Sequence, residues 1–275
     1  MITGPDISSN NPHPIDFAKV KASGQTFVIV KATEGTESTG YTNPYYAGDI
    51  RAARAAGLIV GHYVWPHTAD PAGQVRRALS VLDWELGDLP VALDYEDPEN
   101  VPHGVLDEIR DGLHTAGLPT MTYTYPDYWA RNGDPTCADC ASDPLWYATY
   151  PSRSPGPDAA PPAAPKPWRA VTFWQTDGTR VTVPGIGGLN DMSRFIGTDQ
   201  QFAALRGSAP QEDDVAQWWH DTDGTEWALD AVAKRRITSP AQRQDLQNIG
   251  LLSKTRRDVT TDVDRARLAQ TPEVK

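Results

Sequence analysis

The chain has fewer basic than acidic residues. Its 275 residues carry 25 Lys and Arg against 36 Asp and Glu, which gives a net charge of −11. This charge argues against a protein that tracks nucleic-acid phosphates or binds an anionic membrane surface. Salt confines the repulsion to about 8 Å at physiological ionic strength, so an uncharged polysaccharide remains a suitable partner.

The sequence also lacks a leader and long apolar runs. Its start, MITGPDISSN, has neither the basic residues nor the apolar stretch of a secretory signal. No later run approaches the roughly eighteen apolar residues of a membrane helix. We therefore expect a soluble protein made in the cytosol. With 39% hydrophobic residues and nine Trp, the chain can build one large barrel or two ordinary domains.

Cysteine is scarce, with only Cys137 and Cys140 in the motif CADC. A zinc site needs two further ligands, and His67, His103 and His114 stand at no metal-like spacing from this pair. A local disulfide or two unreactive thiols is the favoured interpretation, and no metal or cofactor is expected. Redox catalysis is poorly supported because no thioredoxin-like helix start follows the pair.

Short β-rich runs alternate with helix-like segments along most of the chain. The runs are 26–35, 58–65, 89–97, 120–126, 144–150 and 170–176, and helical stretches such as 46–57 and 73–86 lie between them. Strands that alternate with helices in this way indicate βα units around a parallel sheet. The predicted fold class is α/β, an irregular barrel of the TIM-like type.

Polar or aromatic residues stand at the carboxyl end of each run. They are Lys31 and Glu34, His62 and Tyr63, Asp94 and Glu96, Tyr123 and Tyr125, Tyr147 and Tyr150, and Trp174 and Gln175. Active sites of such barrels form at this end of the strands, so these side chains are predicted to meet in one cleft. In LDYED, Asp94 and Glu96 share a face because strand side chains alternate, although acids also mark the solvated exits of ordinary strands.

Two segments have the composition of domain boundaries. The Pro-rich stretch 151–167 is flanked by strands with the same pattern at their ends, so it is predicted to be a rim loop of the barrel domain. A boundary is placed instead near 207–214, which gives a barrel domain over 1–207 and a small α-helical module over 208–275.

In this module, Ser239, Pro240 and Gln242 resemble a helix start and Gly250 a stop, and a second helix is expected within 258–270. Its three tryptophans, Trp218, Trp219 and Trp227, are interpreted as the core of a small bundle. A wall-binding surface and a dimer interface are the alternatives. The oligomeric state does not follow from the sequence.

Seven motifs, taken in order, resemble the glycoside hydrolase family 25 lysozymes, the N-acetylmuramidases common among phage endolysins. They are GPDIS (4–8), FVIVKATEGT (27–36), GHYVW (61–65), LDYED (93–97), LWYATY (145–150), FWQT (173–176) and NDMSRFIGT (190–198). Each motif is weak alone, but their order across residues 1–206 is a strong signal. The resemblance implies an irregular barrel of about eight strands with fewer helices than a regular β/α barrel.

The acidic cluster of that family falls on Asp6, Asp94, Glu96 and Asp191. Glycoside hydrolysis needs an acid that protonates the leaving oxygen and a second carboxylate that supports the oxocarbenium-like centre. Crowded carboxylates raise one another's pKa, so one member stays protonated near neutral pH. Glu96 is assigned as this general acid because its longer side chain reaches past Asp94.

The resemblance further implies a retaining mechanism with two open versions. Either the substrate's own 2-acetamido group assists while Asp94 orients it, or Asp94 or Asp191 attacks directly as a nucleophile. Asp6 and Asp191 are expected to tune the cluster and hold the sugar. Without the resemblance, a turn cap would explain Asp6 and a loop acid would explain Asp191.

Aromatic side chains are predicted to bind sugar because pyranose rings present apolar faces. The candidates are Tyr63, Tyr123, Trp146, Tyr150 and Trp174, with Gln175 as a polar contact and Glu34 as a cleft acid. Tyr63 and Trp174 are assigned to the cleft, whereas core packing would explain the other aromatics equally well. A structural pair between Lys31 and Glu34 is the alternative for Glu34.

The resemblance thus implies cleavage of the β-1,4 bond between N-acetylmuramic acid and N-acetylglucosamine in bacterial peptidoglycan. An endolysin of this kind would accumulate in the host cytoplasm and reach the wall through a separate pore, or be carried on the virion. The alternatives are a metal-dependent phosphodiester hydrolase, in which the four carboxylates bind Mg²⁺ or Ca²⁺, and a non-catalytic carbohydrate-binding virion protein. Aromatic strand ends disfavour the first, and the complete set of acids disfavours the second.

Overall fold

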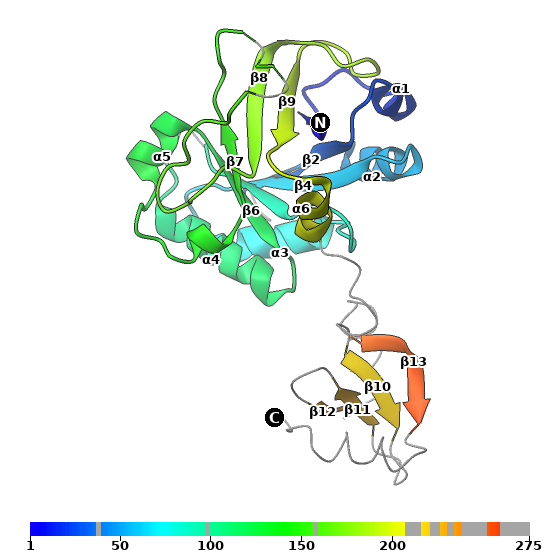
Figure 1. Ribbon diagram of the computed structural model, residues 1–275. Coiled ribbons are helices and arrows are strands. Elements are labelled where there is room, and N and C mark those ends of the chain that lie inside the picture. Colours follow the sequence, from blue (N-terminus) through cyan, green and yellow to red (C-terminus); the bar gives the residue numbers. More distant parts are fainter. Residues whose placement is uncertain are drawn as a thin grey trace. The chain divides into compact units, whose positions relative to one another are not determined.

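The computed structural model describes residues 1–36, 40–96, 99–153, 155–156 and 159–206, and four strands beyond them. By its internal contacts the chain divides into two compact units, residues 1–206 and 207–275 (Figure 1). The division falls beside the predicted boundary at residue 207.

The first unit is a sheet that closes on itself as a barrel. Its seven parallel strands are β1 (Thr3–Ile7), β2 (Phe27–Glu34), β4 (Ile59–Trp65), β5 (Val91–Asp94), β6 (Thr120–Thr124), β7 (Leu145–Ala148) and β8 (Phe173–Val181). Strand β9 (Asn190–Phe195) runs antiparallel between β8 and β1 and closes the ring. The short β3 (Tyr41–Thr42) is added to β2. The predicted irregular α/β barrel is confirmed.

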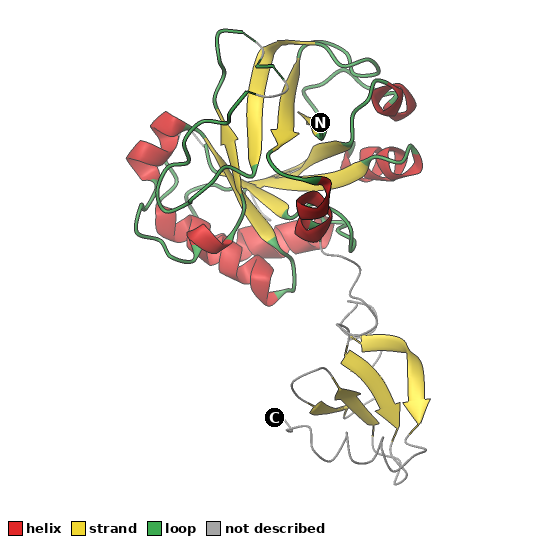
Figure 2. Cartoon of the chain, in the orientation of Figure 1, coloured by secondary structure: helices red, strands yellow, loops and turns green. Residues whose placement is uncertain are grey.

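Helices cover the outer side of the sheet, as Figure 2 shows in red. They are α1 (Phe17–Ala22), α2 (Tyr46–Ala55), α3 (Pro71–Val81), α4 (His103–Thr115) and α5 (Pro126–Asn132), with a 3₁₀ turn, η1, over Cys140–Ser142. In the described residues between β7 and β8, a long loop replaces a crossover helix. None of the helices described is long and apolar enough to span a bilayer.

The helix α6 (Asp199–Leu205) closes the barrel at the end where the parallel strands begin. Its Phe202 contacts the rings of Phe27, Phe173 and Phe195, with centroids 5.0–6.4 Å away. Phe27 and Phe173 are the first residues of β2 and β8. These aromatic rings fill the floor of the barrel, so the opposite end is left for the polar residues at the ends of the strands.

The described residues of the second unit form strands, which corrects the prediction of an α-helical module over 208–275. Strands β10 (Ala216–His220), β11 (Glu226–Leu229) and β12 (Lys234–Ile237) pair antiparallel in this order, and β13 (Leu252–Asp258) runs parallel to β10. Aromatic residues favour strands, and Trp219 stands opposite Trp227 in the ladder. The helices predicted for 239–250 and within 258–270 lie outside the described residues, except that Asp258 ends β13.

Candidate active site

The four acids that the sequence nominated converge at the mouth of the barrel. Asp6 on β1 stands directly opposite Asp191 on β9, a pairing in which Cα atoms are typically about 5 Å apart. Asp94 ends β5, and Glu96 follows two residues later. Because β9 runs against its neighbours, its first residues lie where the other strands finish. Asp6, Glu96 and Asp191 are each close enough to raise the pKa of another member of the cluster.

Glu96 and Asp191 have pKa values near neutrality. Burial and then the charge of Asp191 raise the pKa of Glu96 to about 7, and the nearby hydroxyl of Tyr123 opposes this rise. Burial and then Asp177 raise the pKa of Asp191 to about 6. A carboxyl group with such a pKa can both hold and release a proton at neutral pH.

Asp6 and Asp94 differ in their hydrogen bonds. Gln175 Nε2 donates a hydrogen bond to Asp6 Oδ2 at 2.9 Å. Asp94 is 7% exposed, and its Oδ1 has no hydrogen-bond partner among the described residues. Burial raises the pKa of both groups well above the usual range, reinforced by Asp191 for Asp6 and by Glu96 for Asp94. The cluster therefore retains protons at neutral pH.

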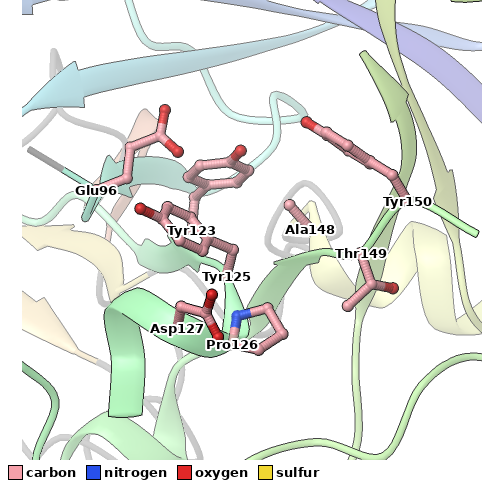
Figure 3. Close-up of a pocket in the computed structure, with 8 residues that line it drawn as sticks. All are labelled: Glu96, Tyr123, Tyr125, Pro126, Asp127, Ala148, Thr149 and Tyr150. Atoms are coloured by element: carbon pink, nitrogen blue, oxygen red, sulfur yellow. The ribbon is translucent and has the colours of Figure 1, made fainter. Parts of the chain in front are cut away.

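A cleft of about 480 Å³ opens beside Glu96. Its lining consists of Glu96, Tyr123, Tyr125, Pro126, Asp127, Ala148, Thr149 and Tyr150. Figure 3 shows Glu96 on one side and Tyr150 on the other, with the rings of Tyr123 and Tyr125 between them. The volume lies within the range of small-ligand sites, and flat rings beside a carboxyl group suit a sugar.

Gln175 was predicted to be a polar contact for the sugar, but it is not among the residues that line this cleft. It organises the cleft from within the barrel. Its Oε1 accepts hydrogen bonds from Tyr123 Oη at 2.9 Å and Tyr150 Oη at 2.6 Å, while its Nε2 is committed to Asp6. The side chain is 2% exposed. Its amide is therefore satisfied within the protein, and Gln175 positions the two tyrosines relative to the acids.

The predicted aromatic residues occupy different positions relative to the cleft. Tyr123 and Tyr150 line the cleft, and Tyr150 is 49% exposed. Tyr63 lies beside the acids. Burial and then the charge of Asp94 raise the pKa of its phenol well above the usual range. Trp146 is 2% exposed, donates to Ser193 Oγ at 2.9 Å and packs against the Tyr123 ring, so it supports the cleft from the barrel interior.

Trp174 was predicted to bind sugar, and the structure corrects this assignment. Its neighbours on β8, Phe173 and Gln175, face the barrel interior, so alternation turns Trp174 to the outer face. There its Nε1 donates to the hydroxyl and carbonyl oxygens of Thr149 at 2.7 and 2.9 Å, and Arg194 lies 4.5 Å from the ring. The motif FWQT alone does not show which face points inward.

Glu34 forms the structural pair that was its alternative explanation. Its carboxylate lies 2.7 Å from Lys31 Nζ and 3.1 Å from His67 Nε2, and in the described residues it is not part of the cleft lining. Lys31 in turn lowers the pKa of Glu96 and Asp94 by its positive charge. Glu34 thus acts on the site through the lysine that it holds.

Sequence reasoning missed three residues at this site. Asp177, 1% exposed, is paired with Arg180 at 2.7 Å and raises the pKa of Asp191. Asp127 and Thr149 line the cleft. In the sequence, Asp177 before a glycine indicates a turn and Asp127 after a proline indicates a helix start. The usable signal was position: Thr149 directly follows β7, Asp177 lies within β8, and Asp127 lies in the first turn of α5 after β6.

A closed barrel with crowded carboxyl groups and an aromatic cleft at its mouth defines a barrel-type glycoside hydrolase. Comparison with known families agrees with this class. The model of glycosyl hydrolases family 25 matches residues 5–185, and the chain belongs to this family.

The chain is similar in sequence to proteins named as a lysozyme and a muramidase. The chain is 30% identical over 186 residues to the autolytic lysozyme of Clostridium acetobutylicum, covering 66% of this chain and 52% of that protein. It is 29% identical over 194 residues to the N,O-diacetylmuramidase of Chalaropsis sp., covering 63% and 87%. The chain therefore spans only about half the length of the first of these relatives.

The fold is shared with the bacterial lysozyme from Streptomyces coelicolor, whose crystal structure matches with a TM-score of 0.64 at 24% identity. That match covers 74% of this chain and 96% of the other.

Proposed function

We propose that this chain is a lysozyme that hydrolyses the β-1,4 bond between N-acetylmuramic acid and N-acetylglucosamine in peptidoglycan. Membership of family 25 and the names of the two relatives support the substrate class. One observation carries the catalytic assignment. Among the four clustered acids in the described residues, Glu96 lines the cleft, and its pKa is about 7.

In the proposed mechanism, Glu96 gives its proton to the bridging oxygen as the bond from that oxygen to the sugar C1 breaks. With the proton on Glu96, Asp94 loses its largest repulsive charge, and Lys31 favours the ionised form of Asp94 against the burial that raises its pKa. In this version Asp94 orients the 2-acetamido group. The acetamido oxygen then bonds to C1, and a water deprotonated by Glu96 opens this intermediate with retained configuration.

A competing version has Asp94 itself attack C1. It leaves a covalent ester between the sugar and Asp94, which mass spectrometry of the quenched enzyme would detect. The proposed version leaves no sugar on the protein.

The decisive variant is Glu96→Gln, which keeps the shape of the side chain and removes the proton. We expect turnover of purified peptidoglycan to fall by about 10²–10⁴-fold, the range that general acid catalysis supplies. The matched control is Glu108→Gln, the same change at an exposed position on α4. Mass spectrometry of wild-type digests should show new reducing ends on muramic acid. Reducing ends on glucosamine, or unchanged clearing by Glu96→Gln, would refute the proposal.

The two other functions give different readouts. A metal-dependent phosphodiester hydrolase would cleave a chromogenic phosphodiester when Mg²⁺ is added, whereas the proposed enzyme releases nothing from it. A non-catalytic protein would bind peptidoglycan without releasing reducing sugar.

The proposed setting is a phage endolysin that accumulates in a bacterial host, because the family that the seven motifs resemble is common among phage endolysins. Expression in a susceptible cell should cause lysis only when a pore-forming protein is expressed as well. Lysis at the same rate without the pore would contradict this route to the wall.

A further inference from the structure

Four metal-ligating side chains gather away from the cleft, where the segment between α5 and β7 meets α4. His103 and Asp107 lie one turn apart on α4, and Cys137 and Cys140 belong to CADC. One potential ligand atom from each lies within 4.8 Å of all the others. The cysteines form a disulfide in this structure, with Cα atoms 5.4 Å apart. Sequence spacing alone had not connected His103 to the pair.

The surroundings of the two sulfur atoms suit thiolates better than a disulfide. Arg110 Nη1 lies 3.2 Å from Cys140 Sγ, and His103 Nε2 lies 3.4 Å from the same atom. The backbone N–H of Cys140 donates to Cys137 Sγ at 3.1 Å. A disulfide carries no charge and needs no such donors, whereas cationic groups and N–H donors stabilise a thiolate.

We propose that the reduced chain binds one Zn²⁺ through Cys137, Cys140, His103 and Asp107. Two thiolates, one imidazole and one carboxylate make a donor set that zinc accepts in tetrahedral geometry. Each half of the site is preorganised, because C-x₂-C forms a tight turn and residues at i and i+4 share a helix face. On zinc the two sulfur atoms separate because they are no longer bonded to each other, and the ligand atoms of His103 and Asp107 already lie nearby.

The charge of this site is balanced within the protein. Zinc with two thiolates and one carboxylate carries a net charge of −1. Arg110 supplies the opposite charge, since its side chain is 5% exposed and its Nη1 lies 2.8 Å from Asp107 Oδ1. Arg110 also pairs with the more exposed Asp111, whose Oδ1 lies 3.1 Å from Arg110 Nη2. Arg110 is therefore a positioning residue that holds Asp107 and the sulfur atoms together.

Formation of the site from the disulfide requires two electrons and two protons from an external dithiol, which itself becomes a cyclic disulfide. Zinc binding then releases the two thiol protons to solvent.

The expected role is structural and is independent of the proposed lysozyme function. The ring of His103 packs edge-on against Tyr95 and Trp129, with centroids 6.3 and 5.6 Å away. Tyr95 separates Asp94 from Glu96 and is fully buried. Zinc would thus fasten the loop to α4 behind the segment that carries two of the acids, and its loss would lower the melting temperature.

The test uses the full chain, reduced with a dithiol, freed of metal and then titrated with Zn²⁺. We expect one zinc per chain by native mass spectrometry and a higher melting temperature with zinc than without. Added Co²⁺ should give the intense visible bands of a tetrahedral site and a thiolate charge-transfer band. A reduced, folded chain that binds no zinc would overturn the proposal, as would a disulfide that survives excess dithiol.

Variants separate the site from adventitious binding. The double variant Cys137→Ser, Cys140→Ser should bind no zinc, and Asp107→Asn should bind it at least about tenfold more weakly. His114→Gln is the matched control, since this histidine is on the same helix outside the cluster and should leave zinc binding unchanged. Arg110→Gln should weaken binding by about 10–100-fold, and Arg110→Lys should restore part of it. Equal zinc affinity in the double variant and wild type would refute the site.

Discussion

At the scale of single residues, the site depends on the alternation of three consecutive side chains. Asp94 and Glu96 turn to the mouth of the barrel, and Tyr95 between them is buried on the other side. Tyr95 Oη lies 2.6 Å from Val101 O and 2.8 Å from Asn132 O, and its single proton is shared between these two carbonyl oxygens, which fixes the chain where β5 ends. The two carboxyl groups are thus positioned by a buried residue that is not part of the cleft lining.

Glu96 is expected to lower the stability of the folded chain at neutral pH. Its pKa is about 7 in the folded chain and 4.5 ordinarily, so the folded state binds more protons between these values and stability falls as pH rises through them. Glu96→Gln should therefore raise the free energy of unfolding by about 1–3 kcal/mol at pH 8 and have little effect at pH 4. Urea denaturation at both pH values measures this. A gain of the same size at both would contradict the assignment.

The pH profile of turnover should also respond to Asp191. Among charged neighbours, Asp191 contributes most to the raised pKa of Glu96. Asp191→Asn should therefore move the alkaline limb of kcat/KM, near pH 7 in the wild type, to lower pH. Asp139→Asn, an exposed change in the CADC loop, is the control. An alkaline limb that stays in place in Asp191→Asn would show that Glu96 does not titrate there.

At the scale of elements, β8 contributes to both the cleft and the acid cluster. It positions Gln175 inside the barrel, and its ladder with β9 is irregular after that residue. Gly178 follows Asp177 in this irregular stretch. A Cβ atom at Gly178 would lie 2.3 Å from Asp191 Oδ1 and 3.0 Å from Tyr150 Oη. The glycine is therefore required by the close approach of two site residues.

Gly178→Ala should disturb catalysis more than folding. The added methyl group displaces the ends of two side chains and no backbone atom, so we expect turnover to fall about tenfold or more while the melting temperature changes little. Gly48→Ala on α2 is the control, because a Cβ atom there meets nothing within 4 Å. Wild-type turnover in Gly178→Ala would show that Asp191 tolerates the displacement.

Much of the barrel could be predicted, because β2, β4, β6 and β7 are runs of β-branched and aromatic residues that end in polar groups. Strands β1 and β9 carry Gly4, Pro5 and Asn190, which local preference assigns to turns, so only the family motifs placed Asp6 and Asp191. The assignment of Trp174 was wrong because the pattern does not specify the inward face of β8. The strands after residue 207 were not predicted, because Ser239, Pro240 and Gly250 resemble the ends of a helix. The tryptophans of β10 and β11 favour strands instead.

At the scale of the whole molecule, the barrel closes within residues 1–206, so a chain that ends there lacks no strand of the ring. We expect this truncated chain to fold and to hydrolyse soluble peptidoglycan fragments at the wild-type rate. Its affinity for intact walls should be lower if the second unit binds the wall. Binding is best measured by co-sedimentation with the Glu96→Gln substitution in both lengths, which prevents digestion. Equal affinity of the two lengths would rule out a targeting role for 207–275.

The reversed direction of β9 decides where the chain leaves the barrel. After β9, α6 packs on the phenylalanines at the floor, so residue 206 emerges on the side remote from the acids. A final strand running parallel to the rest would have released the chain beside the glycan. A segment joined at residue 206 can therefore be exchanged in evolution or by engineering without its attachment point obstructing the approach of a polymeric substrate.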